Sequence, residues 1–149
     1  MASFNIRQVQ DKDIESVVEL CALHAAYEKS EYNKAGKASK LRDAIFKSNP
    51  SLFCFVAEEK GKIVGYTTAT KEFSTWDAEY FLHMDCLYLL ESTRGAGLGS
   101  LLMKKLQDFA AIHACTHIQW QTPVDNLSGI RFYEKQGAVS KDKKRFYLR

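Results

Sequence analysis

The segment at positions 94–100, with the sequence RGAGLGS, constrains the fold of this chain more than any other. It stands between residues 83–89, whose sequence HMDCLYL is typical of a strand, and residues 98–113, whose apolar spacing predicts a helix. Its glycines alternate with small or apolar residues, so backbone N–H groups can approach a ligand without a Cβ atom in the way. The positive end of the following helix faces the same place, and Arg94 adds a fixed cation. The segment therefore predicts an α/β domain with a phosphate-binding loop where a strand turns into a helix.

Two better-known phosphate loops do not match this segment. The dinucleotide fingerprint G-x-G-x-x-G has its third glycine one position later and an acidic residue about 20 positions downstream, where this chain has no acid around Gln119. The nucleoside triphosphate loop ends in Gly-Lys-Ser or Gly-Lys-Thr, whereas the first lysine after Gly99 is Lys104. A purely structural role for the glycines stays open for the G-x-G-x-G pattern alone.

Residues 125–138, with the sequence DNLSGIRFYEKQGA, form a second informative segment. Asp125 or Asn126 is suited to cap a short helix, and Gly137 is suited to end it in a left-handed conformation. Tyr133 then lies one turn before the end of that helix. A Phe-Tyr pair on a short helix is otherwise most often packed in the core, and this second interpretation also stays open.

Both segments resemble parts of one superfamily. The pattern R-x-x-G-x-G between a strand and a helix resembles the pyrophosphate loop of the GNAT superfamily of acyl-CoA-dependent N-acyltransferases. Residues 125–138 resemble the N-x-x-[A/S/G]-x-x-F-Y-x-x-x-G segment that follows the fifth strand there. Within the superfamily, the chain is most similar to the spermidine/spermine (diamine) and thialysine acetyltransferases, because of Tyr27-Glu28, a loop containing Trp76, and an acid, Asp85, nine residues before Arg94.

The resemblance implies an α/β GNAT fold over residues 1–149 as a single domain. It implies a mixed, mostly antiparallel sheet of six to seven strands, about four flanking helices, and a splayed central strand pair that binds acyl-CoA. The apolar pattern predicts strands at 4–9, 52–58, 62–71, 80–90 and 116–121, a final pair at 138–139 and 145–148, and helices at 11–25, 41–45, 98–113 and 126–136.

Composition excludes several other classes of protein. With 149 residues and only two prolines, the chain is expected to fold as one unit, and its charge of +3 is spread rather than clustered on a nucleic-acid-binding face. The four cysteines lack the spacing of a zinc site or a disulfide framework, so neither metal nor disulfide is expected. The N-terminal residues 1–7 lack a signal peptide pattern, and the longest apolar run, 52–57, is too short to span a membrane. We therefore expect a cytoplasmic protein, for which the resemblance implies a homodimer.

The resemblance places the co-substrate acetyl-CoA on three parts of the chain. Its pantetheine arm would pair with backbone groups of Leu87, Tyr88 and Leu89, for which membership of an ordinary core strand is equally consistent. Its far end would meet Asn126 and either Ser128 or Gly129. The pyrophosphate would be held by Arg94, Gly95, Ala96, Gly97, Leu98, Gly99 and Ser100.

Acetyl transfer to an amine assigns tasks to particular side chains. An alkylammonium has a pKa near 10.4, so a base must take its proton, and Asp85 is the candidate, acting directly or through water. Because Asp85 is one methylene shorter than the glutamate of the polyamine enzymes, the water relay is favoured. Tyr133, protonated at neutral pH, is suited to give a proton to the departing thiolate, and the N–H of Leu89 or a neighbour to hold the oxyanion. Tyr27 and Glu28 would line the amine cleft, or equally be an ordinary helix end.

The predicted function is therefore acetyl transfer to a primary amine of a small molecule, with a diamine or polyamine ahead of amino-acid, aminoglycoside or peptide amines. The alternative from a different class is a non-catalytic acyl-CoA-binding module. Such a module should lack the tyrosine at 133 and the acid on the central strand, and both residues are present.

Overall fold

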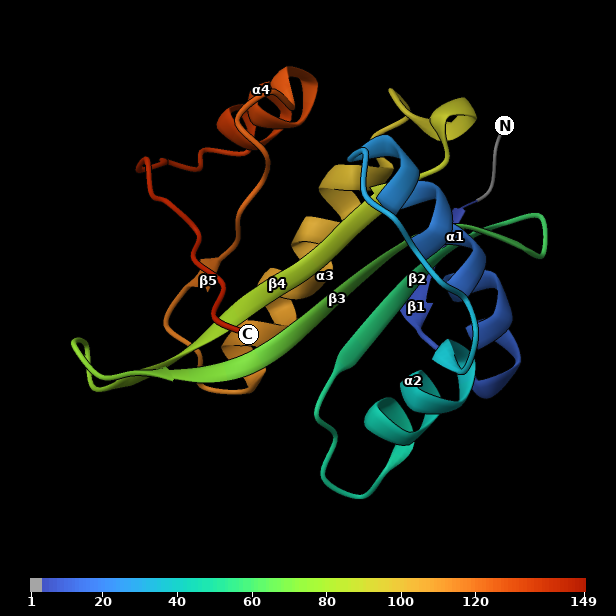
Figure 1. Ribbon diagram of the computed structural model, residues 1–149, viewed down its shortest axis with the longest axis horizontal. Helices are drawn as coiled ribbons and strands as arrows, with labels where there is room; N and C mark the ends of the chain where they lie inside the picture. The colour runs from blue at the N-terminus through green and yellow to red at the C-terminus, as the bar shows by residue number, and fades with distance from the viewer. Residues whose placement is uncertain (1–3) are drawn as a thin grey trace.

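The computed structural model describes residues 4–149 as a five-stranded sheet covered by helices on both faces (Figure 1). The strands lie in chain order, and all neighbours are antiparallel except β4 and β5, which are parallel. The strands are β1 (Phe4–Gln8), β2 (Phe53–Glu59), β3 (Lys62–Ser74), β4 (Glu79–Leu89) and β5 (Ile118–Gln119). The helices are α1 (Ile14–Tyr27), α2 (Lys37–Phe46), α3 (Leu98–Ile112) and α4 (Leu127–Lys135), with short 3-10 turns at Asp11–Asp13 and Glu91–Thr93. Residues 1–3 of the N-terminal segment considered for a signal peptide lie outside the described part of the chain.

The two faces of the sheet bury different helices because the strands alternate. In β2, Cys54 and Val56 pack in the cluster with α1, whereas Phe55 and Ala57 pack in the clusters with α3. Alternation with period two sends successive side chains to opposite faces, and here both faces are apolar because both are covered. Figure 1 shows α1 and α2 on one side of the sheet and α3 on the other.

An ion pair fixes the start of α1 over the sheet. The Arg7 guanidinium donates to both carboxylate oxygens of Asp13, at 2.7 and 3.0 Å, and its Nε donates to Glu58 of β2 at 3.1 Å. These bonds hold the pKa of the buried Asp13 carboxyl below its usual value. A helix anchored in this way carries its last turn, with His24 and Tyr27, toward β4.

A β-bulge at Asp85 reverses the facing of β4 halfway along its length. Thr68 pairs with Cys86 and Ala69 pairs with Met84, so Asp85 has no partner on β3. Met84 accordingly packs on the α3 face, whereas Cys86 and Tyr88, an even number of positions further, pack on the α1 face. The extra residue of a bulge has this effect in general.

The sheet has fewer strands than expected. Residues 138–149 form no strand, and their apolar side chains lie in solvent, with Val139 96% and Leu148 101% exposed. β5 pairs with β4 at two positions only, Leu82 with Ile118 and His83 with Gln119, and so gives a following strand little edge to pair with. The predicted final strands at 138–139 and 145–148 are therefore wrong for this structure, while the fold class is as expected.

Candidate active site

The glycine-rich loop leaves the backbone before α3 open to solvent. Gly95 and Gly97 both have φ near +84°, a region in which residues with a Cβ atom are strained, and Gly97 is the N-cap of α3. A Cβ atom built on either glycine would meet nothing within 4 Å. The space above the loop is therefore open, and the N-terminal N–H groups of a 15-residue helix border it.

Gly99 has a different task from the other two glycines. A Cβ atom there would lie 2.8 Å from the Phe132 ring of α4, closer than real Cβ contacts come. The absence of a side chain at Gly99 thus allows α4 to approach α3. This is a packing role, and the loop pattern alone did not separate it from phosphate binding.

One cavity of about 470 Å³ gathers the predicted site residues. It lies where β4 and β5 separate, since their pairing stops at His83 and Gln119 and the following residues of β4 line its wall. Of the residues predicted for cofactor, substrate or catalysis, every one except Ala96 lines this cavity: Tyr27, Glu28, Asp85, Leu87, Tyr88, Leu89, Arg94, Gly95, Gly97, Leu98, Gly99, Ser100, Asn126, Ser128, Gly129 and Tyr133.

Arg94 joins the loop to the end of α1. Its Nε donates to the carbonyl oxygen of Leu89 at 3.1 Å, and its guanidinium lies over the rings of Tyr27 and Tyr88, 5.1 and 5.3 Å from their centroids. The Tyr27 hydroxyl in turn donates to Oδ1 of Asn126 at 2.6 Å. Its oxygen also lies 3.3 Å from the Ser128 hydroxyl. Tyr27, predicted for the amine, thus contacts three residues predicted for the co-substrate.

Asn126 and Ser100 have protein partners of their own. The Asn126 side chain caps α4 by accepting from Gly129 N–H at 3.3 Å, and its Nδ2 donates to Thr122 at 2.8 Å. A Cβ atom at Gly129 would collide with the Asn126 amide, so glycine is required for this cap. The Ser100 hydroxyl accepts from Nε2 of Gln136 at 2.8 Å, which ties the first turn of α3 to the end of α4.

The two candidate catalytic side chains differ in environment. The Asp85 side chain is 59% exposed in the cavity, with His83 Nε2 3.9 Å away. Tyr133 packs edge-on against Trp120 and Phe132, at centroid distances of 5.2 and 5.4 Å. Burial, followed by the nearby charge of Glu28, raises the pKa of Tyr133 to about 12. Its phenol therefore stays protonated at neutral pH and is able to donate a proton.

Several residues of the cavity were missed from the sequence. The most connected is His24, whose imidazole lies between Tyr66 and Glu28, with nitrogen to oxygen distances of 3.0 and 2.7 Å. Its position four residues before Glu28 on a helix was the available signal. The others are Met84, Cys86, Gln121, Thr122, Phe132, Lys135 and Gln136.

At alkaline pH, the free energy of unfolding of this protein should fall because of Tyr66. Burial raises the pKa of this phenol well above its ordinary value of 10.0. As the pH rises past 10, the Tyr66 phenol therefore loses its proton in the unfolded chain before it does so in the folded protein. Tyr66 leaves the free energy of unfolding unchanged below pH 10 and lowers it as the pH rises above 10. We expect Tyr66→Phe to reduce the slope above about pH 10 by up to ~1.4 kcal/mol per pH unit, measured by denaturant unfolding between about pH 8 and 11. Equal slopes for the two proteins would contradict this account of Tyr66.

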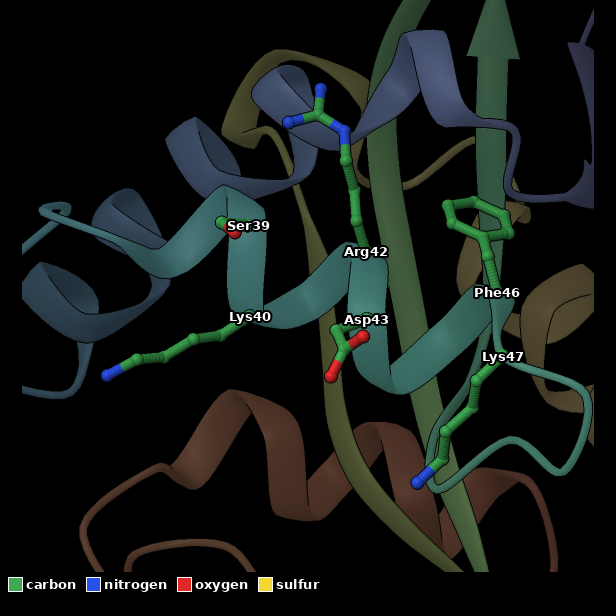
Figure 2. Close-up of a pocket in the computed structure, with 6 residues that line it drawn as sticks. All are labelled: Ser39, Lys40, Arg42, Asp43, Phe46 and Lys47. Carbon is green, nitrogen blue, oxygen red and sulfur yellow. The ribbon is translucent and has the colours of Figure 1, made fainter.

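A second hollow, of about 500 Å³, lies along α2 (Figure 2). Its side chains do not converge. Arg42 points toward the start of α1, and its Nε donates at 3.0 Å to Asp11 of the 3-10 turn that precedes this helix. Asp43 and Lys47 point the opposite way. This hollow therefore has no group of side chains arranged around a ligand.

Two further observations concern residues 4–149 only. They contain no group of three or more His, Cys, Asp or Glu side chains placed to hold a metal ion. Within the same range, no helix combines the length and apolar character needed to cross a membrane.

Comparison with known proteins agrees with this geometry. Residues 17–138 match the Acetyltransferase (GNAT) family. The chain is 25% identical over 146 residues to thialysine N-epsilon-acetyltransferase of Mus musculus, covering 93% of this chain and 85% of the relative. It is 26% identical over 147 residues to spermidine/spermine N(1)-acetyltransferase-like protein 1 of Homo sapiens, covering 93% of this chain and 21% of that longer protein. An aminoglycoside N-acetyltransferase solved in complex with CoA has a TM-score of 0.86 at 16% identity, over 100% of this chain and 96% of the other.

The sheet separates beside a glycine-rich helix N-terminus, and a phenol and two carboxylates line the same cavity. The chain belongs to the GNAT acetyltransferase family and is an acetyltransferase. The predicted family and fold class are thereby confirmed. Acetyltransferases of this family use acetyl-CoA.

Proposed function

We propose that this acetyltransferase transfers an acetyl group from acetyl-CoA to a primary amine of a small molecule, with a diamine or polyamine as the preferred class. The observation that carries the proposal is the meeting of Asp85, Glu28 and Tyr133 in one cavity with the glycine-rich loop. Two carboxylates from different elements, β4 and the end of α1, suit a substrate with two cationic ends. Relatives named for thialysine and for spermidine/spermine add support.

The co-substrate site that we propose has three parts. Backbone N–H groups of 94–100 hold the pyrophosphate, β4 at 87–89 pairs with the pantetheine arm, and Asn126 with Ser128 or Gly129 meets the far end. Acetyl-CoA, when bound, supplies the thioester. The unpaired side of β4 beyond His83 supports this placement, since a ligand that pairs with backbone groups needs a free strand edge.

In the proposed mechanism, each proton has a named donor and acceptor. Asp85 takes a proton from the substrate ammonium, through water because its side chain is short, and leaves a neutral amine as the nucleophile. The N–H of Leu89 or a neighbour donates to the developing oxyanion. The Tyr133 hydroxyl, which is protonated at neutral pH, gives its proton to the departing sulfur. The second proton, which the nitrogen loses as the amide forms, returns to the Tyr133 oxygen through water, and Asp85 releases its own proton to solvent. We further propose, from the family resemblance, a homodimer located in the cytoplasm.

A panel of amines tests the proposal. Diamines, monoamines, amino acids, aminoglycosides and peptides are each incubated with acetyl-CoA, and free thiol is measured. Thiol release that depends on a diamine supports the proposal. Release with none of the amines would favour a non-catalytic acyl-CoA-binding module, and a best substrate without a second cation would remove the diamine assignment.

Glu28→Gln should raise the KM for a diamine by about tenfold and change the KM for a monoamine of equal length much less. The physical reason is that only the diamine has a second ammonium to lose its charge partner. Steady-state kinetics with both amines measure the difference. Glu19→Gln is the matched control, because Glu19 lies on the same helix but pairs with Lys34 outside the cavity. Equal effects on the two amines would contradict the role of Glu28.

A further inference from the structure

His24 has no part in the proposed mechanism, yet it occupies the centre of a side-chain network. The imidazole contacts the Tyr66 hydroxyl through Nδ1 at 3.0 Å and Glu28 Oε2 through Nε2 at 2.7 Å. Its ring stacks on the Tyr88 ring at 5.2 Å, with the planes 21° apart. The His24 side chain is only 15% exposed, and the three partners come from β3, β4 and the end of α1.

The partners determine the tautomer of the imidazole. Tyr66 is 1% exposed, and burial raises the pKa of its phenol, so the hydroxyl keeps its proton. Nearby thiols, those of Cys21 and Cys86, are weak acceptors compared with an imidazole nitrogen. In the neutral imidazole, the phenol therefore donates to Nδ1, and the ring proton is on Nε2, from which it is donated to the Glu28 carboxylate.

We propose that His24 is a positioning residue that fixes the Glu28 carboxylate in the wall of the amine cavity before the substrate arrives. Among the described residues, Oε1 of Glu28 has no hydrogen-bond partner and is available to an ammonium. Glu28 would otherwise be a flexible side chain at a helix end, and holding it in one rotamer removes an entropic cost from binding. Both nitrogens of His24 are engaged, so the residue acts through Glu28 and does not itself take the proton of the amine.

The bulge at Asp85 explains why the network exists in this place. Because the bulge turns Tyr88 to the α1 face, its ring reaches His24, and the same residue lines the cavity. His24 is thereby held against the strand proposed to pair with acetyl-CoA. Contacts between β4 and the end of α1 in this way determine how far Glu28, which would bind the second ammonium of the diamine, lies from the acetyl group of acetyl-CoA. This inference rests on the proposed diamine substrate.

A double-mutant cycle tests the role of His24. His24→Phe keeps a ring against Tyr88 but removes both hydrogen bonds, and should raise the KM for a diamine about tenfold with kcat little changed and the KM for an equal-length monoamine little affected. In the Glu28→Gln background, the same substitution should add almost nothing, since its effect passes through Glu28. An equal loss with both amines, or a full loss in the Glu28→Gln background, would overturn the proposal.

Two further measurements keep the test decisive if His24→Phe folds poorly. Tyr66→Phe removes the donor to Nδ1 and should produce a smaller, diamine-selective rise in KM. Nitrogen-15 NMR of histidine side chains in the wild-type protein without substrate should show the Nε2–H tautomer for His24, and an Nδ1–H tautomer would overturn the arrangement. A wild-type enzyme that does not prefer diamines overturns the proposed substrate together with this role. A KM for the diamine that is unchanged in the folded His24→Phe and Tyr66→Phe variants, in an enzyme that prefers diamines, overturns the role of His24 alone.

Discussion

Gly97→Val is expected to lower the affinity for acetyl-CoA by about 100-fold or more while the protein remains folded. Gly97 has φ near +84°, where a β-branched residue is strained, and its missing Cβ leaves open the space that we assign to the pyrophosphate. The valine methyl groups would fill that space, and relaxation of the strain would turn the N–H groups of the loop away. Each charge-assisted hydrogen bond contributes ~1.5–3 kcal/mol, so the loss of two accounts for the expected effect. Calorimetric titration with acetyl-CoA measures it.

Gly36→Val is the matched control for this experiment. Gly36 also has a positive φ, 73°, is the N-cap of a helix, and has nothing within 4 Å of a built Cβ. It does not line the cavity. The two variants should lose similar stability, and only Gly97→Val should lose affinity. If a folded Gly97→Val bound acetyl-CoA as the wild type does, the assignment of the loop to the pyrophosphate would be wrong.

Tyr133→Phe is expected to lower kcat by roughly 10²–10⁴-fold, the range typical of a general acid. The substitution deletes only the hydroxyl, so the edge-on contacts with Trp120 and Phe132 remain, and affinity for acetyl-CoA should stay near the wild-type value. Single-turnover kinetics with the best amine, under conditions where chemistry limits the rate, measure the effect.

Tyr80→Phe provides the comparison for loss of a tyrosine hydroxyl as such. Tyr80 lies on the β3–β4 hairpin, 47% exposed and packed against Phe73, and does not line the cavity. Its variant should turn over normally. A Tyr133→Phe enzyme with unchanged kcat would return this residue to a packing role and leave the source of the proton on the leaving sulfur to be found elsewhere.

Local sequence patterns determined much of the secondary structure and of the candidate site of this protein. The alternation of glycine with small residues between a strand and a helix is a short-range property, and it was sufficient to predict the loop, the helix after it and the family. The cap at Asn126 and the helix that carries Tyr133 were equally local, since a capping side chain acts on backbone groups within one turn. Sixteen residues that line the cavity could therefore be named in advance. Ala96 was named and does not line it, and His24, Gln121 and Thr122 line it from outside the two motifs.

The tertiary structure alone decided how these parts meet. The reversal of β4 at Asp85 depends on pairing with β3 and is not visible in the sequence of β4, yet it brings Tyr88 to His24. Gly99 is required because Phe132, far along the chain, packs on it. Residues 138–139 and 145–148 were predicted as strands but remain unpaired, because a short apolar segment becomes a strand only when an edge of sufficient length is available to it. Contacts between distant segments determine these features, and a pattern read along one segment carries no information about its partner.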